Sequence, residues 1–144
     1  GATRSASVRA GLAQVPEGVD AVIVHDAARP LAHPGLFSAV LQALVDGADG
    51  AVAAVPVADT LKRVGDDRVV VETVDRSGLW AVQTPQGFRL DVLRVAHAGE
   101  PEATDDAGLV EANGGRVVVV PGDRRNLKVT DPADLDLLEG LMGR

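Results

Sequence analysis

The sequence has no cysteine, few aromatic side chains and no long apolar run. Without cysteine it can form neither a disulfide nor a thiolate metal site. Aromatic residues make up only 2% of the chain, so valine, alanine and leucine must fill any core. No apolar run is long enough to cross a membrane, and the polar start, GATRSASVRAGL, lacks the pattern of a signal peptide. We therefore expect a protein of the reducing cytoplasm.

Positive charge is also scarce. The 144 residues carry 14 Lys and Arg against 21 Asp and Glu, which gives a formal net charge of −7. This balance argues against nucleic acid or an anionic membrane as a partner, but it leaves room for a local basic pocket that holds a phosphate. With 46% hydrophobic residues, the chain is long enough for one domain, residues 1–144, with its own core.

Several common signatures of catalysis are absent. The chain contains no G-x-G-x-x-G, no P-loop, no H-E-x-x-H and no G-x-S-x-G. Its three histidines are not spaced as metal ligands, and we expect His33 and His97 to lie on the surface. Other residue types must therefore carry any chemistry.

Apolar runs alternate with helical patterns along the chain. Short β-branched runs predict buried strands at AVIVHD (21–26), GAVAAVPV (50–57) and RVVVVPG (116–122). Helical patterns occupy residues 5–14, 34–47, 89–99, 104–115 and 131–143. This alternation predicts an α/β domain with a mostly parallel sheet.

The segment that follows the second strand has a different pattern. Gly65-Asp66-Asp67 is a turn signal between two charged, β-rich runs, and it predicts a hairpin arm over about residues 59–80. The run LWAVQTPQGF predicts a strand that leads into a turn at Thr84-Pro85.

Side chains at the helix starts have ordinary roles available to them. Thr104 is a plausible N-cap, and Asp105-Asp106 are typical helix N-terminal carboxylates. Asp131 followed by Pro132 predicts the start of the last helix.

Asp26 and Arg29 stand where the first strand ends. Ligands of open α/β sheets bind beyond the carboxyl ends of strands, where a carboxylate can hold a metal or a hydroxyl and a forked cation can meet a phosphate. The alternatives are a cap on the next turn for Asp26 and a surface ion pair for Arg29.

A second candidate lies after the third strand, in DRRNLKVTDP. In an acidic protein, the clustered cations Arg124, Arg125 and Lys128 indicate an anion site, with a solvated loop as the alternative. Thr60 and Thr84 also stand at element boundaries, where caps and turns explain threonine equally well.

Five blocks of the sequence, taken together and in order, resemble one known family. They are VHDAARP, PVADTLKR, TVDRSGLWAVQTPQGF, TDDAGLVE and NLKVTDPADL. The chain is similar over its whole length to the 2-C-methyl-D-erythritol 4-phosphate cytidylyltransferases of the non-mevalonate isoprenoid pathway. The resemblance implies a Rossmann-like nucleotidyltransferase fold. It implies an enzyme that joins CTP to methylerythritol phosphate and releases pyrophosphate, with Mg²⁺ on the nucleotide phosphates.

The resemblance also implies roles for individual residues. Arg76 and Lys128 match the residues that orient the substrate phosphate. Substrate-binding positions are matched by Asp26, Arg29, Thr60, Thr84 and Thr104. Nucleotide-contacting positions are matched by Gly1, Ser7, Asp26 and Ala27. Family dimers exchange the hairpin arm, so a homodimer is implied in which Thr60 and Arg76 serve the neighbouring subunit's site.

One departure from the family pattern stands out. The glycine-rich nucleotide loop, with its activating Arg and Lys, has no counterpart in these 144 residues. We therefore expect the family fold truncated at its N-terminus, and no transfer activity from these residues alone. The rival interpretations are a ribitol-5-phosphate cytidylyltransferase, which shares much of the pattern, and a non-catalytic dimerisation module.

Overall fold

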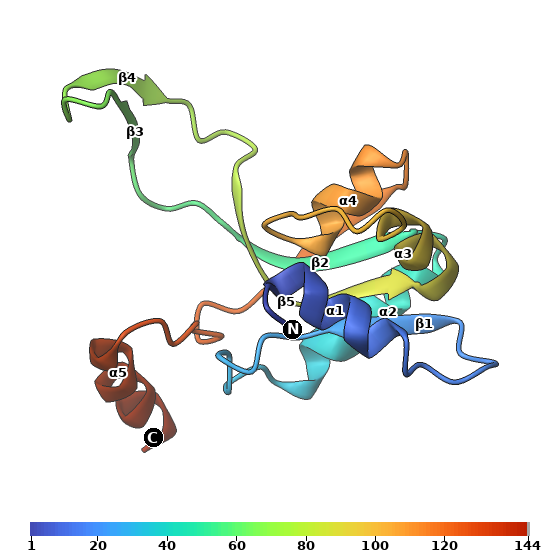
Figure 1. Cartoon of the computed structure of the whole chain (residues 1–144). Helices are drawn as coiled ribbons and strands as arrows, with labels where there is room; N and C mark the ends of the chain where they lie inside the picture. Colours follow the sequence, from blue (N-terminus) through green and yellow to red (C-terminus); the bar gives the residue numbers. More distant parts are fainter. Residues whose placement is uncertain (144) are drawn as a thin grey trace.

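A four-stranded sheet forms the centre of the computed structural model, which describes residues 1–143 (Figure 1). Across the sheet the strands follow the order β1-β5-β2-β6. Their bounds are β1 Ala21–Val24, β2 Gly50–Pro56, β5 Trp80–Arg89 and β6 Val117–Pro121. All four strands expected for the body are present, and β5, which corresponds to the run LWAVQTPQGF, is inserted between the first two.

The sheet differs from the mostly parallel one that we expected. β2 and β6 pair in parallel, but β5 pairs antiparallel with both of its neighbours, β1 and β2. The reason lies in the connection, because parallel neighbours need a crossover whereas antiparallel ones can follow a hairpin. The arm returns the chain from β2 straight into β5, so β5 runs in the opposite direction to the other three strands.

Helices cover both faces of the sheet. α2 (Pro34–Val45) packs its buried Leu36, Val40 and Leu44 on one face against small residues of β2 and against Val120. The other core contains Phe88 of β5 and joins α1 (Arg4–Leu12), α3 (Leu90–Ala96) and α4 (Asp106–Ala112). These two layers fix the strand ends at which the candidate residues lie.

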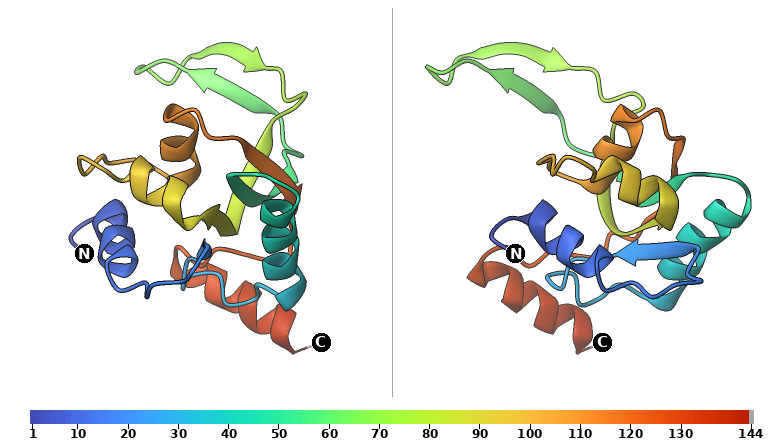
Figure 2. Two further views of the ribbon diagram at one scale, coloured as in Figure 1. Left: turned by 90° about the vertical axis from the view of Figure 1, so that its right-hand side faces the viewer. Right: turned by 45° about the vertical axis from the view of Figure 1, so that its right-hand side comes forward.

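The predicted hairpin is present and extends away from the body (Figures 1 and 2). Its strands, β3 (Leu61–Val64) and β4 (Val70–Val74), form a separate two-stranded sheet. After the arm, β5 continues through Thr84-Pro85 to Arg89, so the expected turn there is wrong. The pairing register between β2 and β5 shifts between Val52 and Ala54 of β2, and this irregularity accommodates Thr84 and Pro85 within β5.

The two later helix starts differ in how well they were predicted. Asp131 caps α5 (Pro132–Met142) as expected, and Asp134 completes a capping box. At α4 the cap is Asp105, which accepts from the Gly108 N–H, so the expectation for Thr104 is wrong. Along the described chain, no helix combines the length and apolar character needed to span a membrane.

Candidate functional site

A pocket of about 260 Å³ opens beside the carboxyl ends of β1 and β6. Asp26 follows β1 and Lys128 follows β6, and Nζ of Lys128 lies 2.9 Å from Oδ2 of Asp26. Arg29, Thr84 and Thr104 also line this pocket. Residues from four separate stretches of the chain thus converge at the place where open α/β sheets bind ligands.

Thr84 is the buried polar centre of this arrangement. Its hydroxyl oxygen accepts a hydrogen bond from the Asp26 N–H at 3.0 Å and lies 3.0 Å from Nδ1 of His25. The other imidazole nitrogen of His25 lies 3.2 Å from the Arg29 carbonyl oxygen, which can only accept. In its neutral form His25 therefore donates from Nε2, and the Thr84 hydroxyl donates to Nδ1. This network fixes the turn between Asp26 and Arg29.

Arg29 is held by the loop that follows β6. Its Nη1 donates to the backbone oxygen of Asn126 at 2.7 Å. Burial lowers the pKa of the Arg29 guanidinium below its usual value, and the nearby Asp26 carboxylate partly offsets this effect. An arginine pKa begins so high that the group remains a cation at neutral pH, so it can attract an anionic ligand.

Asn126 joins the loop after β6 to β5. It is completely buried, and its amide donates to the Thr84 carbonyl oxygen at 2.8 Å and to Oε1 of Gln83 at 3.3 Å. Gln83 in turn exchanges hydrogen bonds with the backbone of Asp123. These contacts hold the loop that carries Lys128 in one conformation.

Gly122 makes this close approach possible. A Cβ added to it would lie 2.6 Å from Oε1 of Gln83 and 2.9 Å from the Ala54 carbonyl oxygen. Farther along the loop, the Val129 N–H donates to the Ala28 carbonyl oxygen at 2.8 Å. The loop and the β1 turn are therefore connected through their backbones as well as through the Asp26–Lys128 pair.

The structure gathers some of the expected site residues and not others. Asp26, Arg29, Thr84, Thr104 and Lys128 line one pocket. Ala27 is exposed in the turn beside that pocket.

The remaining expected site residues lie elsewhere in the described chain. Ser7 lines a separate groove of about 390 Å³ between α1 and β1, and Gly1 precedes that helix. Thr60 and Arg76 flank the arm strands and are exposed, outside the lining of the pocket.

Sequence reasoning missed a buried charged cluster next to the pocket. His97, expected on the surface, is only 5% exposed, and its Nε2 lies 2.9 Å from Oδ1 of Asp106. The other oxygen of Asp106 accepts from Nη2 of Arg4 at 2.7 Å. Asp106 is therefore not an ordinary helix-start carboxylate, and no local sequence signal marks a pairing between residues about a hundred positions apart.

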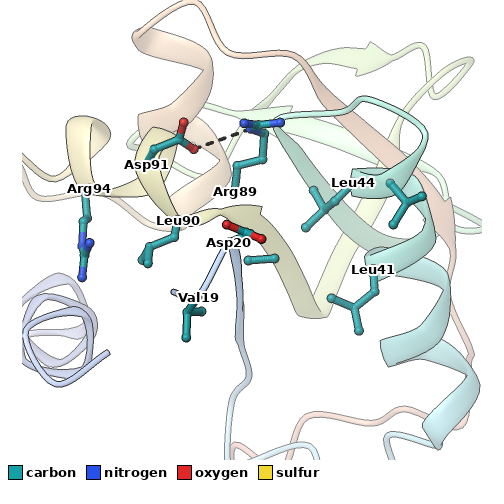
Figure 3. Close-up of a pocket in the computed structure, with 10 residues that line it drawn as sticks. Val19, Asp20, Leu41, Leu44, Arg89, Leu90, Asp91 and Arg94 are labelled. Atoms are coloured by element: carbon teal, nitrogen blue, oxygen red, sulfur yellow. Dashed lines mark ion pairs between the residues drawn. The ribbon is translucent and has the colours of Figure 1, made fainter. Parts of the chain in front are cut away.

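A larger cavity, of about 750 Å³, lies at the opposite end of the sheet (Figure 3). Leu41, Leu44 and Leu90 give it apolar walls, and the ion pair between Arg89 and Asp91 at 3.5 Å lies at its edge. It borders the start of β1 and the end of β5, and it contains none of the residues that the sequence marked for chemistry. The smaller pocket is therefore the better candidate.

Protein ligands for a metal do not gather in the described part of the chain. No group of three or more His, Asp or Glu residues within 1–143 is arranged to hold an ion. Asp26, the carboxylate nearest the strand ends, is already paired with Lys128. These residues do not fit a magnesium site built by the protein alone.

Comparisons with known proteins identify one family over the whole chain. The profile of the 2-C-methyl-D-erythritol 4-phosphate cytidylyltransferase family matches residues 1–144. The enzyme of that name from Frankia casuarinae is 54% identical over the whole chain, which spans 54% of its length. The one from Parasynechococcus marenigrum is 49% identical over 99% of the chain, which spans 64% of its length.

A solved structure extends the match to three dimensions. The crystal structure of 2-C-methyl-D-erythritol 4-phosphate cytidylyltransferase from Thermus thermophilus superposes with a TM-score of 0.90 at 41% identity, covering 100% of this chain and 71% of that one. The expected nucleotidyltransferase fold is thereby confirmed. The chain belongs to the 2-C-methyl-D-erythritol 4-phosphate cytidylyltransferase family.

Proposed function

We propose that the protein transfers CMP from CTP to 2-C-methyl-D-erythritol 4-phosphate, in isoprenoid biosynthesis. The observation that carries the proposal is the convergence of Asp26, Arg29, Thr84, Thr104 and Lys128 on one pocket, in a chain of this family. The chain spans only 54% to 64% of the first two relatives' lengths, so the reaction of the whole enzyme is inferred from them.

The proposed reaction exchanges one phosphorus–oxygen bond for another. An oxygen of the alditol phosphate attacks the α-phosphorus of CTP, and a new bond forms between them. The bond from the α-phosphorus to the bridging oxygen breaks, and pyrophosphate leaves with the electron pair. No protein nucleophile is needed, so the side chains act by positioning the reactants and compensating charge.

Lys128 and Asp26 suit this task because their ion pair is easily rearranged. The side chain of Lys128 is 47% exposed, and partly exposed ion pairs contribute little stability. An incoming phosphate can draw the ammonium group from Asp26. The carboxylate is then free to accept from a ligand hydroxyl, and Arg29 and Thr84 remain fixed behind it.

The arm is proposed to complete the site of a second subunit. Thr60 and Arg76 are exposed and lie outside the pocket, although their counterparts in the family bind substrate. Val69, Val70 and Val71 of the arm are each more than half exposed, which is costly without a partner surface. A homodimer that exchanges arms would cover these valines and bring Arg76 to the neighbour's pocket.

The remaining parts of the proposal concern the nucleotide. Gly1, Ser7 and Ala27 are assigned to the cytidine side, next to Asp26. Mg²⁺ is expected to arrive on the phosphates of CTP, and no step above depends on a metal held by the protein. The cytoplasmic location expected from the composition belongs to this proposal too.

Pyrophosphate release by the full-length protein tests the assignment. The protein is supplied with CTP, Mg²⁺ and either 2-C-methyl-D-erythritol 4-phosphate or ribitol 5-phosphate. Faster release with the methylerythritol compound supports the proposal. Preference for ribitol 5-phosphate would reassign the substrate, and no release with either would favour a non-catalytic dimerisation module.

A further inference from the structure

The cluster of Arg4, Asp106 and His97 lies where α1 meets the start of α4. Asp106 is completely buried, and both of its oxygens are engaged, one by His97 at 2.9 Å and the other by Arg4 at 2.7 Å. A buried carboxylate is costly unless it is paired, so these two partners fix its position. Asp106 consequently fixes one edge of the Arg4 guanidinium.

The other edge of that guanidinium has no protein partner. Nη1 of Arg4 is buried and makes no hydrogen bond to any of residues 1–143. Leaving a charged donor buried and unpaired is unfavourable, and an exception of this kind calls for an explanation. Arg4 also lines the 260 Å³ pocket, together with Asp26 and Lys128.

The charges around the pocket favour an anion beside Arg4. Arg4, Arg29 and Lys128 line it against two carboxylates, Asp26 and Asp105. Lys128 pairs with Asp26. Arg29 donates from Nη1 to the Asn126 carbonyl oxygen, while its Nε, like Nη1 of Arg4, is buried without a partner in residues 1–143. Asp105 is occupied as the cap of α4. Of the two arginines with an unpaired donor, Arg4 is the one whose guanidinium is held by a buried carboxylate.

We infer that Arg4 binds a phosphate oxygen in this pocket and that Asp106, supported by His97, is the positioning residue that aims it. The inference rests on the proposed function, because the phosphate belongs either to the alditol phosphate or to CTP. A guanidinium held along one edge by a carboxylate can present its other edge to a phosphate. The same ion pair connects α1, which carries Ser7, with the segment that carries Thr104.

Arg9 provides a matched control on the same helix. Its Nη1 donates to the Pro101 carbonyl oxygen at 3.0 Å, and its Nη2 pairs with Glu102 at 3.1 Å. Arg9 thus ties α1 to the same segment of chain as Arg4 does, but it does not line the pocket. A merely structural role for Arg4 would make the two substitutions alike.

The test compares Arg4→Gln, Arg4→Lys and Arg9→Gln in the full-length protein. Steady-state kinetics give separate KM values for CTP and for 2-C-methyl-D-erythritol 4-phosphate. Arg4→Gln should raise one of them about 10- to 150-fold, the range for losing a charged hydrogen bond, and the affected KM identifies the phosphate. Arg9→Gln should leave both within about twofold, because exposed ion pairs contribute little.

Arg4→Lys is included because Arg4→Gln could fail to fold. Lysine keeps a charge for Asp106 but lacks the fork that reaches both partners, so the same KM should rise. Asp106→Asn should raise this KM as well. The double variant Arg4→Gln with Asp106→Asn should have the same KM as Arg4→Gln alone, because Asp106 acts through Arg4. Equal effects of Arg4→Gln and Arg9→Gln, or wild-type KM values in Arg4→Lys, would overturn the inference.

A binding measurement separates this inference from the proposed function. If the wild-type protein transfers no CMP, the proposed function fails, but calorimetric titration with inorganic pyrophosphate still examines Arg4. Weaker pyrophosphate binding in Arg4→Gln than in Arg9→Gln supports the phosphate contact. Identical binding in the two variants contradicts it.

Discussion

The pocket and the arm are stabilised in opposite ways. Around the pocket, Asn126 is fully buried and Thr84 is 4% exposed, and each makes hydrogen bonds to a distant part of the chain. On the arm, Val69 and Val71 are 60% and 66% exposed, and within residues 1–143 the two arm strands pair only with each other. An isolated two-stranded hairpin is marginally stable in water. The body therefore holds its pocket residues in place by itself, whereas the arm would gain a partner surface in the homodimer that we propose.

Removing the arm should have the largest effect. Deletion of residues 63 to 73 takes away the exposed valines, so the full-length protein should sediment as a monomer. CMP transfer should fall at least as far as in Arg76→Ala, because Thr60 and Arg76 no longer reach a neighbour. Analytical ultracentrifugation and pyrophosphate release provide the two readings. A deletion variant that keeps the mass of a dimer would disprove the role of the arm.

Loss of either phosphate-orienting cation comes next. Arg76→Ala and Lys128→Ala should each lower kcat/KM for the alditol phosphate about 10- to 150-fold, the range for a lost charged hydrogen bond. CTP binding, measured by calorimetry, should change much less in Arg76→Ala. The assignment of Arg76 is wrong if that variant loses CTP affinity and keeps its alditol phosphate kinetics.

Within the body, Asn126→Ala should lower stability more than any single arm valine. The change leaves the buried Thr84 carbonyl oxygen without the Asn126 amide, and it removes one of the two donors to Oε1 of Gln83. Such a loss costs about 1–3 kcal/mol, whereas Val70→Ala on the exposed arm should stay within about 0.5 kcal/mol. Urea unfolding of both variants at a concentration where the wild type is monomeric makes the comparison. Equal losses would mean that the arm is stabilised within its own chain.

The smallest expected effect is on the stability of the protein in acid, through a carboxylate at the start of α5. The backbone N–H of Thr130, then its hydroxyl and the Asp131 N–H, lower the pKa of the partly exposed Asp134 below its usual value. A depressed carboxyl pKa stabilises the folded state above the unfolded pKa of about 3.9, and that contribution is lost as pH falls through the folded pKa. Asp134→Asn should therefore flatten the decline of stability below about pH 4. If stability declines with falling pH in the same way in Asp134→Asn as in the wild type, Asp134 does not contribute to the acid dependence.

The sequence predicted the parts of the site that depend on strand ends. Asp26 and Lys128 each follow a β-branched run, and the carboxyl ends of parallel strands meet at one edge of a sheet. The strand β5 was predicted from LWAVQTPQGF, but its antiparallel direction was not, because that direction depends on the arm that precedes it. Asn126 and the His97–Asp106–Arg4 cluster were missed for another reason: their partners lie from 9 to 102 residues away, so only tertiary packing brings them together.

Mixed dimers test the central claim, that each site takes Lys128 from one subunit and Arg76 from the other. Arg76→Ala and Lys128→Ala proteins are each assayed alone and then after their subunits have been exchanged. In a mixed dimer with swapped arms, one site regains both wild-type residues and the other loses both. With random exchange, activity should rise to about a quarter of the wild-type value, because half of the dimers are mixed and each has one intact site. Activity that stays at the level of the separate variants would show that Arg76 serves its own subunit, and would contradict the account.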